Sequence, residues 1–417
     1  MHTSRRRFSL RNLVASAPGR ADFLNTHQDY KGLPVVPAAI NLRARIFAKP
    51  TGTKLFKIRA PDLEEYGEES FDSFEIKKES VPLMEEGFFG NYFRAVVNVL
   101  LRKGFTEELS GVDATIKSEI PIGSGLASSA AIEVAFTTLI NRLCSLGLNK
   151  REIAEVSFEA ENVEMGIPCG RLDQYGVSFG DIIKLECRPP YRVELLPFKD
   201  LTFVIIDSGI RHSTGDIHPK RQDELERGLK VLMDSSVVPP SLKDKLGYRY
   251  FQPIWEKIGE DELKPYMSLL DDEACRRILF TIKMQRLTEF ALKVLKFEEL
   301  DRWEILRNIG SEGWKKVKQS LAKERAHLIL GFVMNEQHTL LRDYYDLSTP
   351  ELEEICRVAI EAGAYGAKIS GAGLGGSIIA LVKDLGVGRR VVEEALRSGA
   401  KKGWVSTLGD GAKIENR

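Results

Sequence analysis

The sequence predicts an α+β protein in two parts, each built from mixed sheets and helices. Its 417 residues are too many for one ordinary hydrophobic core, so two domains are the natural expectation. Short β-rich runs alternate along the chain with longer stretches of helical spacing. We therefore expect one domain over residues 1–200 and a second over residues 201–417, with strand-like runs on either side of the border.

The first part should begin as a sheet, because its early β-rich runs are separated by Gly and Pro. It then becomes helical, first with apolar and small residues at helical spacing and later with an amphipathic pattern stopped by Gly166 and Pro168. The expected elements are strands within 13–49 and over 112–120, a buried helix over 125–146 and an amphipathic helix over 150–166.

The second part is mostly helical and charged, and it ends in a further α+β segment. A Pro-rich interruption, "VVPPS", divides the helical region. The expected elements are strands over 181–189 and 201–209 at the border, helices within 221–347, a helix over 351–364 and a strand–turn–strand over 367–382.

Composition excludes several classes of function. Lys and Arg together number 60, as do Asp and Glu, so no global basic surface indicates binding to nucleic acid or to an anionic membrane. No apolar stretch is long enough to span a bilayer, and the basic "SRRR" at residues 4–7 is not followed by a signal-peptide core. The five scattered cysteines include no CxxC pair, so we expect a reduced, cytoplasmic protein without a zinc site.

The sharpest local motif is "PIGSGLASSAA", residues 121–131, in which a strand runs into a Gly-rich turn and then into a helix. Glycine lets the backbone approach a ligand closely, and the free N–H groups of a helix N-terminus favour an anion. Neither the Walker A pattern nor the Rossmann fingerprint is satisfied. The alternative is a helix N-terminus capped by Ser, with small residues that serve packing.

A second Gly-rich stretch, "GAGLGG" at residues 371–376, matches GxGxxG. The strand-like "SIIALV" follows it where a dinucleotide site needs a helix, so that interpretation lacks its structural context. We expect a tight loop that packs against a phosphate or against the first Gly-rich loop.

Isolated polar residues complete the set of candidates. Arg20, His27 and Asp29 occupy the Gly-bounded stretch "APGRADFLNTHQDYKG", while Asp173 follows a Pro-Cys-Gly turn and Glu161 lies on a helix. Together with the two Gly-rich stretches, they resemble the GHMP kinases, most closely the galactokinase branch. The resemblance covers nearly the whole chain, with "APGR…HQDYKG", "PIGSGLASSAAIEVA", "PCGRLDQ", "DSGIRHS", "MNEQHTLL" and "AKISGAGLGGSIIAL" in the family order.

The resemblance implies two α+β domains that hold ATP and a sugar in the cleft between them, with phosphorylation of the anomeric hydroxyl. Asp173 matches the catalytic base, and Arg20 matches the Arg beside it and the transferring phosphate. Ser129 and Glu161 match the Mg²⁺ ligands. The residues that match the nucleotide-binding positions are Gly123, Ser124, Gly125, Leu126, Ala127, Ser128, Ser129, Arg211, Gly371 and Gly373.

The sugar-binding positions match Thr26, His27, Asp29, Gly170 and Arg171, and here the chain departs from the family. Thr26 stands where galactokinases carry Glu, and Arg171 replaces an apolar residue. A Tyr expected shortly after "RHS" is missing, and Ile217 and His218 are near its place.

These departures leave the exact sugar open. D-Galactose or a close galacto-configured derivative is expected, with a galacturonate 1-kinase, in which Arg171 pairs with the sugar carboxylate, or an arabinose kinase as alternatives. A non-catalytic sugar sensor is the alternative from another class, although Arg20, Ser129, Glu161 and Asp173 are all present. The expected partners are the sugar and ATP alone, and the sequence indicates no oligomeric state.

Overall fold

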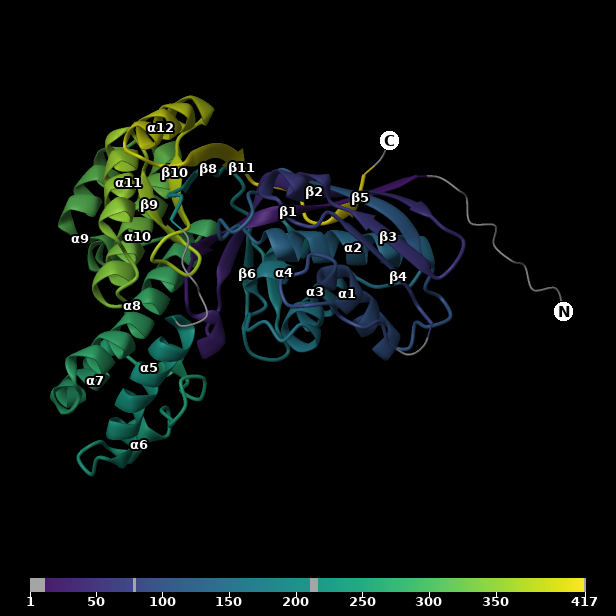
Figure 1. Ribbon diagram of the computed structural model, residues 1–417. Coiled ribbons are helices and arrows are strands. Elements are labelled where there is room, and N and C mark those ends of the chain that lie inside the picture. Colours follow the sequence, from purple (N-terminus) through teal and green to yellow (C-terminus); the bar gives the residue numbers. More distant parts are fainter. Residues whose placement is uncertain (1–11, 78–79, 211–216, 416–417) are drawn as a thin grey trace.

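Two sheets organise the chain in the computed structural model, which describes residues 12–77, 80–210 and 217–415 (Figure 1). The "SRRR" stretch and Arg211 therefore lie outside the described residues. The first sheet has the order β12-β1-β2-β5-β3-β4, antiparallel except between β3 and β5. Its strands are β1 (Leu13–Leu24), β2 (Val36–Pro50), β3 (Leu55–Arg59), β4 (Phe71–Glu75), β5 (Val112–Ser118) and β12 (Lys413–Ile414).

Helices cover one face of this sheet (Figure 1). The expected buried helix is α2, which packs its small side chains, such as Ala130 and Ala131, directly against β1 and β2. The expected amphipathic helix is α3, which continues as the π-helical turn η3 (Ala160–Glu164). The four helices and the small hairpin beside them are α1 (Asn91–Arg102), α2 (Ser128–Cys144), α3 (Lys150–Glu159), α4 (Leu172–Phe179), β6 (Ile183–Leu185) and β7 (Val193–Leu195).

The second sheet is fully antiparallel, in the order β11-β8-β10-β9. Its first strand begins at Thr202, next to the expected border, yet β12 returns from the C-terminal end to pair with β1 in the first sheet. Helices α10, α11 and α12 pack against this sheet, and α5, α6 and α7 project away from it (Figure 1). The strands are β8 (Thr202–Asp207), β9 (Gly366–Ser370), β10 (Ser377–Val382) and β11 (Lys402–Thr407).

The helical region contains one long central helix, α8, against which α5 and α10 pack. No helix of the described residues is long and apolar enough to cross a membrane. The helices of this part are α5 (Ile217–Asp234), α6 (Pro240–Lys243), α7 (Glu260–Leu263), α8 (Asp272–Leu295), α9 (Arg302–Gln319), α10 (Ala322–Asp343), α11 (Pro350–Glu361) and α12 (Leu385–Arg397).

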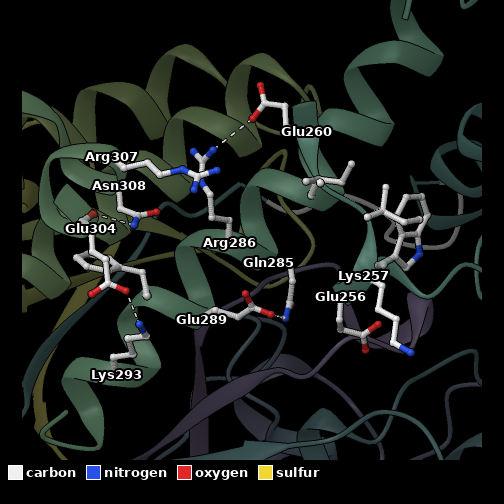
Figure 2. Close-up of a pocket in the computed structure, with 15 residues that line it drawn as sticks. Glu256, Lys257, Glu260, Gln285, Arg286, Glu289, Lys293, Glu304, Arg307 and Asn308 are labelled. Carbon is white, nitrogen blue, oxygen red and sulfur yellow. Dashed lines mark hydrogen bonds and ion pairs between the residues drawn. The ribbon is translucent and has the colours of Figure 1, made fainter. Parts of the chain in front are cut away.

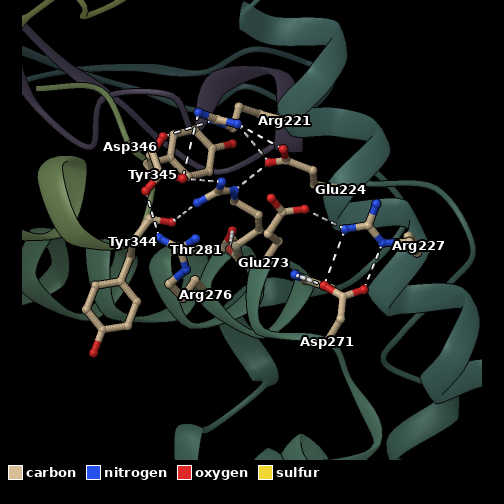
Figure 3. Close-up of polar contacts among 12 residues, drawn as sticks. Arg221, Glu224, Arg227, Asp271, Glu273, Arg276, Thr281, Tyr344, Tyr345 and Asp346 are labelled. Carbon is tan, nitrogen blue, oxygen red and sulfur yellow. Dashed lines mark hydrogen bonds and ion pairs between the residues drawn. The ribbon is translucent and has the colours of Figure 1, made fainter.

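A buried ionic network joins α5 and α8 to the segment that follows α10 (Figure 3). The Arg277 guanidinium donates to Glu224 Oε2 at 2.6 Å and to Asp346 Oδ2 at 2.5 Å. Arg221 donates to Glu224 at 2.9 Å and, through Nε, to the backbone oxygen of Tyr345 at 2.9 Å. The network thereby fixes Tyr345, whose ring lies near the turn that contains His27.

We expect Arg277→Ala to lower the free energy of unfolding by about 1–3 kcal/mol, because the buried Glu224 carboxylate loses one of its two guanidinium partners and keeps only Arg221 among the described residues. The matched control is Arg357→Ala, which removes an exposed guanidinium paired on the surface of α11 and should change stability by less than about 0.5 kcal/mol. Urea denaturation of both variants measures the difference, and equal costs would contradict this account.

Candidate functional site

The first Gly-rich turn leads directly into α2. Gly123 and Gly125 have φ of 66° and 73°, and Ala127, the residue before the helix, has φ of 59°. Ala127 offers no side-chain hydrogen bond to the first turn of α2. The expected alternative of a Ser-capped helix is therefore not what the structure shows, and the first N–H groups of α2 remain available to an anion.

The second Gly-rich turn packs against the first, as the sequence led us to expect. Ser377 Oγ donates to the backbone oxygen of Ser124 at 2.6 Å. A Cβ atom on Gly125 would lie 3.2 Å from the Ser370 oxygen and 4.0 Å from the Gly371 Cα, and Gly371 itself has φ of 92°. The two turns thus form one continuous backbone surface between the two sheets.

Arg20 of β1 joins this surface to the predicted catalytic base. Its Nε and Nη2 donate to Asp173 Oδ1 at 2.8 and 2.6 Å, and its Nη1 donates to the Gly125 oxygen at 2.5 Å. Arg20 is buried, whereas the Asp173 side chain is 29% exposed. Because both bonds from Arg20 go to Oδ1, the other oxygen of Asp173 keeps its capacity to accept a proton from a ligand.

Ser129 and Glu161 lie together beside the N-terminus of α2. Ser129 Oγ donates to Glu161 Oε1 at 3.0 Å, and Gln174 Nε2 donates to Glu161 Oε2 at 2.6 Å. Burial, followed by the negative charge of Asp173, raises the pKa of Glu161 to about 7. The Ser129 hydroxyl and the Glu161 carboxylate form a pair of hard oxygen donors. A cation bound to them would offset the repulsion between the Glu161 and Asp173 carboxylates.

A strained turn follows β1 and carries the predicted sugar-binding residues. Asn25 and His27 both have positive φ, of 68° and 63°. Asn25 Nδ2 donates to the Pro34 oxygen and to Gln285 Oε1 of α8, which holds the turn in this conformation. His27 Nε2 lies 3.1 Å from the backbone oxygen of Ala372, in the second Gly-rich turn. Burial and the nearby cationic groups lower the pKa of His27 well below its usual range.

Asp29 and Gly170 lie in contact, although they are far apart in the sequence. A Cβ atom on Gly170 would come within 2.0 Å of Asp29 Oδ2, so only glycine leaves room for this carboxyl group. Burial, with the charge of Asp22 as the next cause, raises the pKa of Asp29 to about 6. Asp29 therefore packs directly against the loop that leads to Asp173.

Thr26 accepts a hydrogen bond from a buried lysine of the protein itself. The buried Lys368 Nζ donates to Thr26 Oγ1 at 2.7 Å and also to the backbone oxygens of Asp22 and Ile369. Burial lowers the pKa of Lys368 to about 8. These contacts give Thr26 a role in joining the sugar-binding turn to β9, so its expected contact with the sugar stays a prediction. The role of Lys368 was not predicted.

Arg171 is paired with a carboxylate of the protein itself. Its Nε donates to both carboxylate oxygens of Glu155, at 2.9 and 3.2 Å, and its guanidinium lies 3.9 and 3.8 Å from the ring centroids of Phe158 and Tyr191. The ion pair with Glu155 and the two rings disfavour a pairing of Arg171 with a sugar carboxylate, and that pairing stays a prediction.

His218 of α5 stands close to the sugar-binding turn. Its ring centroid lies 5.0 Å from that of His27 and 5.3 Å from that of Tyr30. Tyr30 in turn shares a hydrogen bond with Tyr345 at 2.7 Å between hydroxyl oxygens. The sequence analysis found His218 near the position where the family carries a Tyr. In the structure, the aromatic ring of His218 lies beside the sugar-binding turn.

A separate cavity of about 430 Å³ lies between α8 and α9 (Figure 2). Its walls carry charges of both signs, as Figure 2 shows for Arg286, Arg307, Glu289 and Glu304. Gln285 lines this cavity and is also the partner of Asn25. The cavity therefore lies behind the sugar-binding turn and is distinct from the residues around Asp173.

Comparison with protein families gives three matches. The description "GHMP kinases N terminal domain" matches residues 91–181, "GHMP kinases C terminal" matches residues 319–401, and "Galactokinase galactose-binding signature" matches residues 5–50. Together these regions contain both Gly-rich turns, the sugar-binding turn and Asp173.

Similar proteins and structures agree with these matches. The chain is 28% identical to a galactokinase of Roseiflexus sp. over 89% of its length and 84% of that protein, and 29% identical to a galactokinase of Thermococcus kodakarensis over 90% and 92%. The crystal structure of Lactococcus lactis galactokinase complexed with galactose has a TM-score of 0.74 at 22% identity and covers 97% of this chain and 95% of that one. A mevalonate kinase structure has a TM-score of 0.65 at 17% identity, covering 95% and 99%. The expected two-domain fold is confirmed.

Proposed function

The chain belongs to the GHMP kinase superfamily, in its galactokinase-like branch, and we propose that it catalyses ATP-dependent phosphorylation of the C1 hydroxyl of D-galactose. The observation that carries the proposal is the contact of Arg20 with both Asp173 and the Gly125 oxygen. This contact places a basic carboxylate next to an anion-binding turn, and the sugar-binding turn follows directly on the same strand.

The reaction needs a hydroxyl group to become a nucleophile. Asp173 accepts the proton of the C1 hydroxyl through its free oxygen, and the sugar oxygen then bonds to the γ-phosphorus of ATP as the bond to the β–γ bridging oxygen breaks. Arg20 keeps Asp173 oriented and carries a fixed positive charge toward the phosphate surface, where negative charge develops. The first-turn N–H groups of α2 bind the phosphates of the nucleotide.

The residues beside α2 fit a magnesium ion. Ser129 and Glu161 supply two hard oxygen donors, and the described residues contain no cluster of three or more His, Cys, Asp or Glu that would hold a metal by themselves. This pattern suits Mg²⁺, which usually takes one or two protein ligands together with phosphates and water. When bound, the ion would neutralise charge on the phosphates. Ser129 and Glu161 are the residues that would hold it.

Galactose is favoured over the alternatives. His27 and Asp29 offer the sugar a neutral imidazole and a carboxylate, a pair that recognises neighbouring hydroxyls. Galacturonate is less favoured, because Arg171, the residue expected to pair with its carboxylate, already pairs with Glu155. The sensor alternative is disfavoured by the assembled pair of Arg20 and Asp173. The relatives named above are galactokinases, and one was crystallised with galactose.

The proposal keeps the cytoplasmic location and the two domains at residues 1–200 and 201–417. All five cysteines are free thiols, which is typical of a reducing compartment. The second domain is taken to include β12, although this strand completes the first sheet. ATP and the sugar are the only partners that the proposal requires.

The first experiment is a coupled kinase assay with galactose, galacturonate, N-acetylgalactosamine, glucuronate and arabinose. We expect galactose to give the highest kcat/KM of the five sugars. A higher value for a uronate would contradict the proposed substrate, and the absence of ATP consumption with every sugar would contradict the proposed activity.

Asp173→Asn should lower kcat by about 10²–10⁴-fold, because the amide cannot accept the hydroxyl proton. Galactose binding, measured by calorimetry, should remain within a few-fold of the native value, since Asn retains the size of Asp and a hydrogen-bond acceptor. Asp181→Asn, on an exposed carboxyl group paired with Lys199, is the matched control and should leave kcat unchanged. Normal turnover by the Asp173 variant would rule out its role as the base.

The kcat/KM for galactose should fall as the pH decreases through about 6. The buried Asp29 has its pKa raised to about 6, so below this pH it becomes a neutral acid and loses acceptor capacity for the sugar hydroxyls. Above this pH the Asp29 carboxylate is ionised, and a further change near pH 7 would come from Glu161, whose pKa is raised to about 7. In Asp29→Asn, kcat/KM for galactose should be low at every pH and should not fall further below a pH of about 6. The kcat/KM for ATP, measured at saturating galactose, is the control that reports titration of other groups in the site.

Arg171→Ala should affect galactose and galacturonate equally, within about threefold of one another, because its guanidinium is paired inside the protein. The variant should be less stable, since the Glu155 carboxylate loses its positive partner and keeps the Tyr175 hydroxyl. Parallel kinetics with the two sugars measure the ratio. A selective loss of galacturonate turnover would restore the hypothesis that Arg171 binds a carboxylate.

A further inference from the structure

Glu133 is a buried acid that nothing in the reaction described above uses. It lies in α2, one turn after Ser129, and its side chain has no exposure to solvent. Neither carboxyl oxygen has a hydrogen-bond partner among the described residues. A buried, unpartnered carboxyl group lowers stability, and such groups are rare in proteins. An apolar residue would pack in α2 at lower cost, so this acid calls for an explanation.

The burial of Glu133, with no partner on either carboxyl oxygen among the described residues, favours its neutral form. Burial is the main cause that raises its pKa well above the usual range, and the carboxyl group of Glu161 raises it further. The Gln174 side chain is close enough to act in the opposite direction by hydrogen bonding. Tyr92 of α1 also lies near the pair: burial is the main cause that raises the pKa of its phenol group, and the charges of Glu161 and Glu133 raise it further. A neutral Glu133 has one O–H group to donate.

Gln174 connects Glu133 to the predicted cation site. Its Nε2 donates to Glu161 Oε2 at 2.6 Å, while its Oε1 is buried and has no partner among the described residues. A neutral carboxyl group offers an O–H donor, and the unpartnered amide oxygen needs one. The O–H of Glu133 would therefore satisfy Gln174 Oε1. That bond would fix which end of the amide faces Glu161.

We propose that Glu133 is a positioning residue, which acts through the Gln174 amide to hold the Glu161 carboxylate in its cation-binding orientation. The inference rests on the proposed function, in which Ser129 and Glu161 hold Mg²⁺. Residues that orient a metal ligand from behind usually matter almost as much as the ligand itself. The arrangement accounts for the buried acid, for the orphan amide oxygen and for the position of Glu133 one turn from Ser129.

A purely structural role and a positioning role differ in what Glu133→Leu would do. Leu fills a similar volume and removes an unpartnered polar group, so the melting temperature should stay level or rise. Without its partner, the Gln174 amide is no longer fixed, and the affinity for the cation should fall. Stability and cation binding are thus expected to move in opposite directions.

The test measures binding of Mn²⁺ in the presence of a non-hydrolysable ATP analogue, by electron paramagnetic resonance on the full chain. We expect Glu133→Leu and Gln174→Leu each to raise the Kd by about 10–100-fold, and the double variant to add little to either. Glu133→Gln, which keeps a neutral donor, should stay within about threefold of the native value. The matched control is Thr138→Val, because this buried hydroxyl of α2 bonds only to the Val134 oxygen; it should leave the Kd unchanged.

Three results would overturn the proposal: native affinity in Glu133→Leu, a loss in Glu133→Gln as large as that in Glu133→Leu, or an equal loss in Thr138→Val. Because the readout is cation binding and melting temperature, it does not depend on which sugar is phosphorylated. A native chain that fails to phosphorylate galactose would contradict the proposed substrate and leave the binding comparison fully interpretable.

Discussion

The position of the Arg20 guanidinium is the constraint on which the site depends. It leaves β1 and binds both Asp173, which lies 153 residues later, and the backbone of the first Gly-rich turn. The same strand runs on into the turn of His27 and Asp29. One strand therefore fixes the distance between the base, the phosphate-binding surface and the sugar-binding side chains. The helices α2 and α4 pack against this strand and keep it in place.

Elements with a strong local signal could be predicted, and the others could not. The strands around residues 13–49, α2, α3 and the strand–turn–strand at the second Gly-rich turn follow the sequence pattern. Helix α12 was not foreseen, because Gly386 and Gly388 in its first turn are typical of a loop. Gly388 is needed there for close packing, since a Cβ atom would lie 2.7 Å from Val405. Helix α1 was not predicted either: it begins at Asn91, and the preceding Gly90 supplies no side-chain cap that the sequence could announce.

At the site, residue types were predictable but side-chain directions were not. Asp173 and Arg20 meet as the motifs imply, since both are fixed by backbone elements. Arg171 is next to the site in sequence, yet Glu155 and two rings decide where it points. Lys368 looks like an ordinary lysine within an apolar strand, and only the tertiary fold brings it to Thr26. Such contacts depend on packing between distant segments, which one sequence does not reveal.

The return of β12 to the first sheet has a mechanical consequence. The chain crosses between the sheets ahead of β8 and again after β11, where the backbone N–H of Gly409 donates to the Ala39 oxygen and the Gly409 oxygen accepts from the Asp181 N–H. Arg43 also binds the backbone oxygens of Asp410 and Gly411. The two crossings meet in the second sheet, because Thr202 of β8 pairs with Thr407 of β11. The C-terminal end of the chain therefore fastens the second sheet to β1 and β2, the strands that lead into the site.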